Sequence, residues 1–193
     1  MFIKKGQILV ADTLSRKMYV YDDGKLLKII DDVWLGKNGT SLEENMHEGG
    51  MKTPIGEYNL GISFGTMNIQ INYPYIQIDS NSYWVDDVNS NYYNYFVQIG
   101  NEVPKFNYQY VISMRDKDFE SAEHLIDYPL EYKCAVYIEY NAHNIIPGKG
   151  SAIFLHCHGT KGYTGGCLSI SENDMIWIIR YLDVNKNPKI IIK

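Results

Sequence analysis

Three shortages restrict what this chain of 193 residues can be. The first is apolar length: no run of 18 apolar residues occurs, so the sequence predicts no transmembrane helix. The opening apolar run, within residues 1–12, is also too short for the core of a signal peptide. Two alternatives stay open, a cytosolic protein or a protein whose export segment precedes this sequence.

The second shortage is positive charge. The 18 lysines and arginines are outnumbered by 23 acidic residues and form no basic run, so nucleic acid is not an expected partner. The third is cysteine. Cys134, Cys157 and Cys167 show no CxxC spacing, so neither a disulfide framework nor a metal site is expected, and no cofactor is predicted. Cys134 and Cys157 are interpreted as packing residues, which is the usual role of a free cysteine.

Apolar residues and tyrosine, in contrast, are plentiful. The apolar fraction of 45% allows a sizeable core, and the length fits a single domain over residues 1–193. Seventeen tyrosines indicate a β-rich protein or a groove lined with aromatic rings. A polar segment at residues 86–94 is interpreted as a turn or as the wall of a substrate groove.

Short apolar runs separated by turn residues predict a mostly β fold with a few short helices. The expected strands cover residues 7–10, 17–21, 26–30, 57–62, 75–78, 83–85, 135–140 and 190–192. One short helix is predicted at residues 121–126 with Ser121 as its N-cap, and another begins after Ser171. The second helix carries an apolar stripe at helical spacing, formed by Met175, Ile178, Ile179 and Leu182.

The most informative stretch is residues 151–170, SAIFLHCHGTKGYTGGCLSI. Cys167 follows two glycines, and it comes eleven residues after His156, which ends an apolar run. A thiol attacks as its thiolate, and a nearby imidazole can take its proton, so the pair fits a nucleophile and its base. Gly165 and Gly166 let the backbone turn sharply, so that N–H groups near Cys167 could form an oxyanion hole.

His158 is the alternative base, since in an extended segment it shares a face with His156. His158 is otherwise expected to face the loop or to contact substrate. Thr164 is expected to shape the entrance of the site.

The segments IFLHC (153–157) and TGGCLSI (164–170), with KTPIG (52–56) and the opening DTLSRKMYVY hairpin, resemble the L,D-transpeptidase catalytic domain, also called YkuD-like. The resemblance implies a β-sandwich or barrel-like fold, in which Cys167 is the nucleophile, Gly166 its glycine partner and His156 the base. Tyr140 is the candidate for a tyrosine that contributes to the oxyanion site in some members. The motif lacks the usual Ser-His-Gly-Cys run and the following arginine, and is closer to a subgroup with Thr-small-Gly-Cys.

By this resemblance, the chain is expected to act in cell wall biogenesis and cell shape in the bacterial envelope. The cysteine would form a thioester with a peptidoglycan stem peptide and pass the acyl group to an amine, giving a 3-3 cross-link or a wall attachment. Carbapenem-type inhibitors are expected to react with the same thiol. Two alternatives remain: an amidase or carboxypeptidase that uses water, and a wall-binding module without catalysis.

Overall fold

The computed structural model describes residues 5–193. Residues 1–4 fall outside it, so the interpretation of the opening run lies partly outside the described residues. Fourteen strands and one α-helix occur in this range, which confirms the predicted mostly β fold class. No helix of residues 5–193 has the length and apolarity that crossing a membrane requires.

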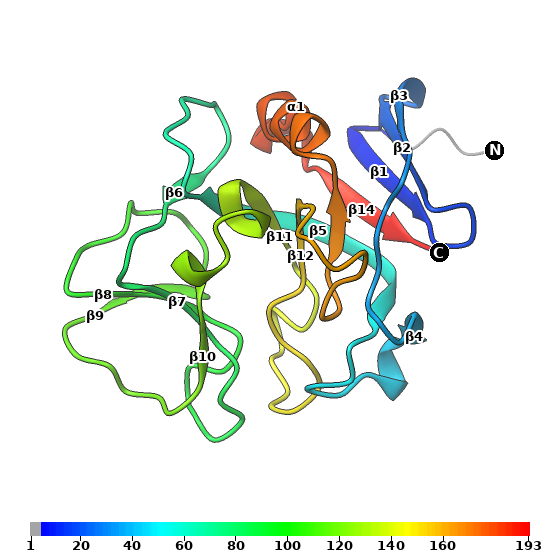
Figure 1. Ribbon diagram of the computed structural model, residues 1–193. Coiled ribbons are helices and arrows are strands. Elements are labelled where there is room, and N and C mark those ends of the chain that lie inside the picture. Colours follow the sequence, from blue (N-terminus) through cyan, green and yellow to red (C-terminus); the bar gives the residue numbers. More distant parts are fainter. Residues whose placement is uncertain (1–4) are drawn as a thin grey trace.

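The larger sheet has ten strands (Figure 1). Its main path runs through β13 (Leu168–Ile170), β12 (Phe154–Cys157), β11 (Ala135–Ile138), β5 (Thr53–Gly65), β14 (Lys189–Ile192), β1 (Gln7–Asp12), β2 (Lys17–Asp22) and β3 (Lys25–Ile30). Two short strands, β4 (Thr40–Leu42) and β6 (Tyr75–Gln77), pair with β5. The expected meander of three opening strands is confirmed, because β1, β2 and β3 pair antiparallel in sequence order.

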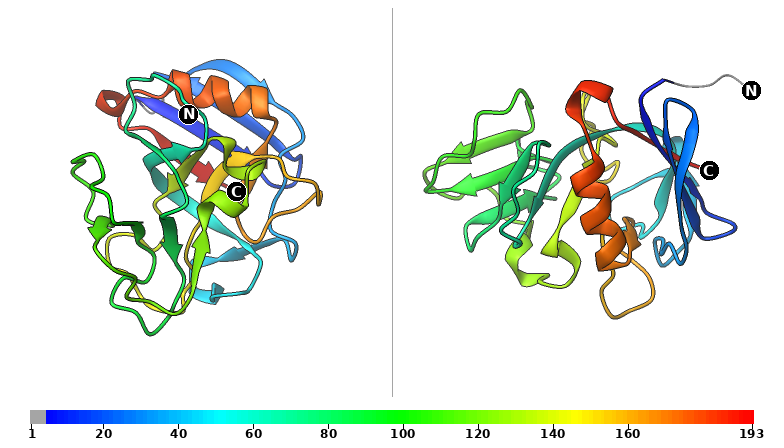
Figure 2. Two further views of the ribbon diagram at one scale, coloured as in Figure 1. Left: turned by 60° about the vertical axis from the view of Figure 1, so that its left-hand side comes forward. Right: turned by 90° about the horizontal axis from the view of Figure 1, so that it is seen from above.

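Helix α1 (Glu172–Tyr181) begins where the sequence predicts a helix. The Ser171 hydroxyl accepts a hydrogen bond from the Asp174 N–H at 3.2 Å, which satisfies an N–H group that the helix itself cannot pair. The predicted apolar stripe is buried against the larger sheet. Figure 2 shows α1 lying across that sheet, with the meander on one side and the smaller sheet on the other.

The smaller sheet is formed by the middle of the chain, in the order β10 (Ala122–His124), β7 (Ser82–Val85), β8 (Phe96–Ile99) and β9 (Val111–Met114). The predicted helix at residues 121–126 is wrong. Residues 122–124 pair with β7, and only Leu125–Asp127 form a short 3₁₀ turn, η2. Pairing of Glu123 with Trp84 supplies tertiary contacts that override a weak local helix signal. Three other 3₁₀ turns are η1 (Glu43–Asn45), η3 (Glu131–Lys133) and η4 (Val184–Lys186).

The buried side chains divide into two main clusters of different character. The aliphatic cluster includes Leu9, Met18, Val20, Val136, Leu155, Leu168, Ile178 and Ile190. The aromatic cluster includes Phe64, Trp84, Phe96, Tyr110, Tyr132, Tyr137, Phe154 and Cys167. Successive residues of a strand point to opposite faces, so Leu155 joins the first cluster and Phe154 the second. Strands β11 and β12 therefore separate the two clusters.

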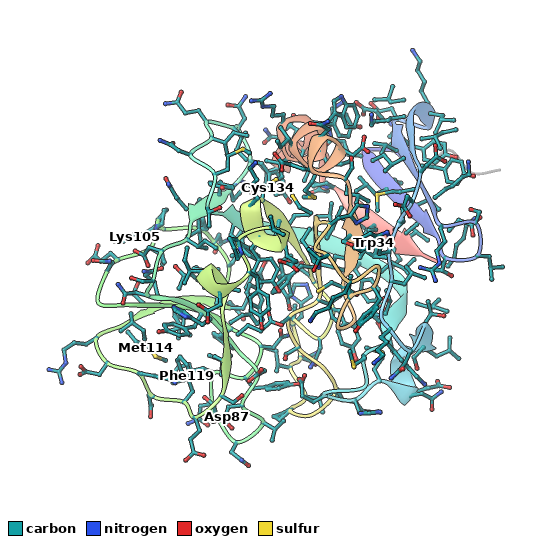
Figure 3. All side chains as sticks on the ribbon, in the orientation of Figure 1. Trp34, Asp87, Lys105, Met114, Phe119 and Cys134 are labelled. Atoms are coloured by element: carbon teal, nitrogen blue, oxygen red, sulfur yellow. The ribbon has the colours of Figure 1, made fainter. Side chains whose placement is uncertain are left out.

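The same alternation explains the two packing cysteines. Cys157 shares the face of Leu155, and both it and Cys134 are fully buried in the aliphatic cluster as free thiols. Their sulfur atoms lie 3.7 Å apart. Figure 3 shows Cys134 in the interior near α1, far from Phe119 and Met114 at the smaller sheet. His156, in contrast, points to the side of the aromatic cluster.

Candidate active site

Strand β12 places His156 in a buried position with one nitrogen already occupied. Its Nδ1 lies 2.7 Å from the backbone carbonyl oxygen of Cys157, and its exposed fraction is 5%. A carbonyl can only accept a hydrogen bond, so Nδ1 carries the proton and Nε2 keeps its lone pair. Burial lowers the pKa of His156 to about 4, so the ring is neutral at neutral pH. His156 is thus a neutral imidazole with Nε2 available as a proton acceptor.

The turn before Cys167 is held by two threonine hydroxyls. Thr164 Oγ1 donates to the carbonyl oxygen of Cys167 at 2.6 Å and accepts from the Gly166 N–H at 3.1 Å. Thr53, at the start of β5, donates to the same Cys167 carbonyl at 3.3 Å. This contact is the structural link between the KTPIG and TGGC segments.

Gly166 occupies a position that a larger residue would strain. Its φ is +147°, and a Cβ there would lie 3.0 Å from the Lys52 carbonyl oxygen and 3.3 Å from a methyl carbon of Ile153. A Cβ at Gly165 would meet nothing within 4 Å. The second glycine is therefore required by geometry, whereas the first is not.

The Cys167 thiol is buried and hydrogen-bonded to the backbone. Its Sγ accepts from the Phe154 N–H at 3.2 Å and donates to the Ala152 carbonyl at 3.2 Å. Burial raises the pKa of the thiol, and the nearby carboxylate of Glu123 raises it further. Within residues 5–193, no hydrogen bond joins the thiol to His156. The resting site is therefore a neutral thiol and a neutral imidazole, with the thiol directed to Ala152.

Ala152 itself is held in place by Asn94. The backbone of Ala152 has a left-handed φ of +53°, and its N–H donates to Asn94 Oδ1 at 3.0 Å. The Asn94 amide is fully buried and donates to Tyr137 Oη at 2.9 Å and to the Asn141 carbonyl at 2.9 Å. Trp84 Nε1 also donates to Asn94 Oδ1, at 2.8 Å. Asn94 thus fixes the carbonyl that holds the thiol, a role that no local sequence signal reveals.

Cys167 and His156 line one cavity of about 280 Å³. Most of the charged side chains around it are acidic, and Lys161 is the one cation among the lining residues of the described chain. The acidic side chains are Glu48, Asp86, Glu123 and Glu131. Glu48 is tied to the wall, because Tyr93 and Ser151 donate to its Oε2, the latter at 2.8 Å. Glu123 accepts from Tyr132 Oη at 2.5 Å.

Two backbone donors beside the thiol are unoccupied. The N–H groups of Gly165 and Cys167 have no hydrogen-bond acceptor among residues 5–193, whereas that of Gly166 is used by Thr164. The unpaired donors therefore lie on either side of the glycine that the geometry requires.

The structure brings five of the seven residues singled out in the sequence to this cavity: Cys167, His156, Gly166, Gly165 and Thr164. Tyr140 is not there. Its hydroxyl donates to the Lys149 carbonyl at 2.5 Å, and its ring packs against Tyr58. Tyr128, Tyr132 and Tyr163 line the cavity instead, and the Tyr132 ring lies edge-on to His156 with 5.6 Å between ring centroids.

His158 lies outside the cavity as well. Strand β12 ends at Cys157, and the His158 ring stacks on Trp34 with centroids 3.9 Å apart. Its Nδ1 lies 3.0 Å from Ser169 Oγ. Trp34, labelled in Figure 3, pairs with Ser169 of β13. The alternative that His158 is the base is not supported by this position, because its ring contacts Trp34 and Ser169 and does not line the cavity.

The fold and the cavity define a β-rich domain that carries a cysteine and a neutral histidine in one acidic pocket. The family model of the L,D-transpeptidase catalytic domain, YkuD, matches residues 6–192, and the chain belongs to that family. The resemblance inferred from the sequence is thereby confirmed, while its assignment to the subgroup with Thr-small-Gly-Cys stays a prediction.

Several solved structures are similar to this chain over nearly its whole length. Bd1075 of Bdellovibrio bacteriovorus is 13% identical with a TM-score of 0.50, covering 98% of this chain and 48% of that one. The helical cell shape determining protein Pgp2 of Campylobacter jejuni is 15% identical with a TM-score of 0.49, covering 97% and 47%. An L,D-transpeptidase of Mycobacterium smegmatis is 14% identical with a TM-score of 0.44, covering 97% and 58%. The chain spans about half the length of these proteins, and no curated protein matches it.

Proposed function

We propose that Cys167 is the nucleophile of a peptidoglycan L,D-transpeptidase, in which residues 1–193 act as one catalytic domain. The observation that carries this proposal is the shared cavity. A buried thiol, a histidine with a free Nε2 and two unpaired N–H groups line or border the same space. These are the nucleophile, base and oxyanion donors that acyl transfer needs.

In the first half-reaction, the thiol leaves the Ala152 carbonyl and gives its proton to His156 Nε2. The sulfur attacks the carbonyl carbon of the stem peptide, and the N–H groups of Gly165 and Cys167 stabilise the developing oxyanion. Each such donor is typically worth about 10²–10³ in rate. His156 then protonates the leaving amine, a thioester remains on Cys167, and His156 is neutral again.

The acidic wall supports a cationic substrate. The cavity has four carboxylates against one lysine, which suits the free amine of a diamino acid in the stem peptide. Asp86 belongs to the polar segment at residues 86–94 that the sequence predicts as a turn or a groove wall. A substrate of the cell wall also supports the bacterial envelope as the place of action, with a role in wall biogenesis and cell shape.

Incubation with a tetrapeptide stem or a carbapenem, followed by mass spectrometry of the intact protein, tests the nucleophile. We expect a covalent adduct on the wild type and none on Cys167→Ala. An unmodified wild-type protein would contradict the proposal. Equal muropeptide binding by wild type and Cys167→Ser without any turnover would instead support the wall-binding module.

The acceptor is tested by the products formed from purified wall fragments. Cross-linked dimers indicate transfer to an amine, and shortened stems indicate hydrolysis by an amidase or carboxypeptidase. We expect dimers, because the acidic cavity favours an ammonium group over water near the thioester.

A further inference from the structure

Glu123 is the acidic residue of the cavity that is tied most directly to the catalytic pair. It lies in β10 opposite Trp84, and it lines the cavity together with Cys167 and His156. Tyr132 Oη donates to its Oε2 at 2.5 Å, and the same Tyr132 ring packs edge-on against His156. One buried tyrosine therefore fixes Glu123 on one side and contacts the proposed base on the other.

The number of protons that an amine acceptor must lose indicates a role for the Glu123 carboxylate in the transfer half-reaction. An amine acceptor with a lysine-like pKa arrives as an ammonium ion, and it must lose two protons before it becomes an amide nitrogen. His156 can take only one, because its Nδ1 proton is already donated to the Cys157 carbonyl and only Nε2 is free. A second proton acceptor is needed whenever the acceptor is a protonated amine.

We propose that Glu123 is this second proton acceptor, and so a catalytic residue of the transfer half-reaction. The inference rests on the proposed function. The ammonium group gives one proton to the Glu123 carboxylate, and the neutral amine attacks the thioester carbon. As the C–N bond forms and the C–S bond breaks, the second proton passes through His156 Nε2 to the sulfur. The products are an amide, the Cys167 thiol and a neutral Glu123 carboxyl, which then returns its proton to water.

The titration of Glu123 is consistent with this role. Burial of the carboxyl raises its pKa to about 7, and the charges of Asp86 and Glu48 add to the shift, while the Tyr132 hydroxyl opposes it. The other titratable groups lining the cavity are Tyr128, Glu131, His156, Lys161, Tyr163 and Cys167. A base with a pKa near the working pH is the most efficient one for proton transfer. Transfer to an ammonium acceptor should therefore rise with pH through about 7.

Acceptors that are neutral at pH 7 provide the contrast. Water and hydroxylamine each lose a single proton when they attack the thioester, and His156 alone can take it. Glu123 should thus matter for aminolysis by an ammonium group and not for hydrolysis. This difference separates a transpeptidase from a hydrolase built on the same cysteine.

The test uses the acyl-enzyme formed from a tetrapeptide stem, with three acceptors compared: Nα-acetyl-D-lysine amide, hydroxylamine and water. In Glu123→Gln we expect acyl-enzyme formation to persist, transfer to the lysine amide to slow at least about tenfold, and reaction with hydroxylamine to change less than about threefold. An equal slowing with both amines, or an unchanged rate with the lysine amide, would overturn the inference. Failure of the wild type to form any acyl-enzyme would sink the proposed function instead.

Two further variants keep the test sharp. Tyr132→Phe removes the hydroxyl that lowers the Glu123 pKa, so the pH at which transfer to the lysine amide reaches half its maximum should move upward. If Glu123→Gln does not fold, Tyr132→Phe is the variant that tests the role of Glu123. An unchanged pH of half-maximal transfer in Tyr132→Phe would count against the inference. Glu131→Gln removes a negative charge from the same side of the cavity, so it should raise KM for the lysine amide without shifting the pH of half-maximal transfer. A shift of that pH would show that the acidic residues act together as the proton acceptor, and not Glu123 alone.

Discussion

The two core clusters stabilise the protein in different ways. The aliphatic cluster joins α1 to the meander and to one face of the larger sheet, and its buried members are mainly leucine, isoleucine, valine and methionine. The aromatic cluster joins the other face of the larger sheet to the smaller sheet, and it contains buried polar atoms that are hydrogen-bonded to one another. Trp84 alone lies beside five other aromatic rings while its Nε1 donates to the buried Asn94.

The candidate active site lies where the two clusters meet along the chain. Cys167 belongs to the aromatic cluster, and Leu168, the next residue, belongs to the aliphatic one. On the aliphatic side, the pairing of β13 with β12 holds the backbone that directly follows Cys167. The aromatic side provides the hydrogen bonds that hold the thiol, through Ala152 and Asn94. We infer that a substitution in the aliphatic cluster lowers only the free energy of unfolding. A substitution in the aromatic cluster should also lower the rate at which Cys167 is acylated.

The largest effect is expected when one cysteine in each cluster is replaced by alanine and the two variants are compared. Cys167→Ala should abolish adduct formation with a carbapenem, because the proposed nucleophile is gone. Cys134→Ala removes a thiol from the aliphatic cluster and should lower the free energy of unfolding by about 1 kcal/mol while adduct formation persists. Intact-protein mass spectrometry and urea unfolding measure the two quantities. Loss of the adduct in both variants would contradict the inference that only the cysteine of the aromatic cluster is needed for acylation.

The next largest effect is expected at Asn94. Asn94→Ala leaves the Ala152 N–H and the Trp84 indole N–H buried without an acceptor, which should lower the free energy of unfolding by about 2–5 kcal/mol. The acylation rate should also fall, because the Ala152 carbonyl that holds the thiol loses its support.

Ile178→Ala is the matched control in the aliphatic cluster. It should cost a similar amount, about 2–5 kcal/mol, through a cavity under α1. Well below both melting temperatures, Ile178→Ala should acylate at the wild-type rate. Equal acylation rates in the two variants would show that Asn94 acts on stability alone.

This contrast also explains how far the sequence could predict the fold. The strands of the meander and the helix after Ser171 depend on local signals, namely alternation, turn residues, a cap and an apolar stripe. Those signals predict the aliphatic half well. The helix expected at residues 121–126 fails in the other half, where pairing with β7 decides the conformation.

The candidate site divides in the same way. Cys167, His156 and the two glycines are adjacent to recognisable sequence patterns, so the sequence singles them out. Tyr132 and Glu123 reach the cavity from η3 and β10, and their place there depends on long-range packing that no spacing encodes. Tyr140 is suggested only by the family resemblance, and its hydroxyl donates to the Lys149 carbonyl outside the cavity.

A smaller effect is expected from the two glycines. Gly166→Ala places a Cβ against the Lys52 carbonyl in a backbone conformation that side chains disfavour, at a cost of about 1–3 kcal/mol. Gly165→Ala meets open space and keeps its N–H, so the change should stay within about 0.5 kcal/mol. Thermal unfolding and adduct formation measure both variants. A larger loss for Gly165→Ala than for Gly166→Ala would contradict the turn geometry.

The smallest effect concerns the pH dependence of the first half-reaction. His156 can act as a base only when it is unprotonated, and burial lowers its pKa to about 4. The rate of adduct formation with a carbapenem should therefore change less than about threefold between about pH 5.5 and 8, and fall only as the pH approaches the His156 pKa. A titration of acylation near pH 6.5, the ordinary histidine value, would show that the base is exposed and lies outside this cavity. Because transfer to an ammonium acceptor is expected to rise through about pH 7 with Glu123, the two half-reactions should show different pH profiles on one enzyme.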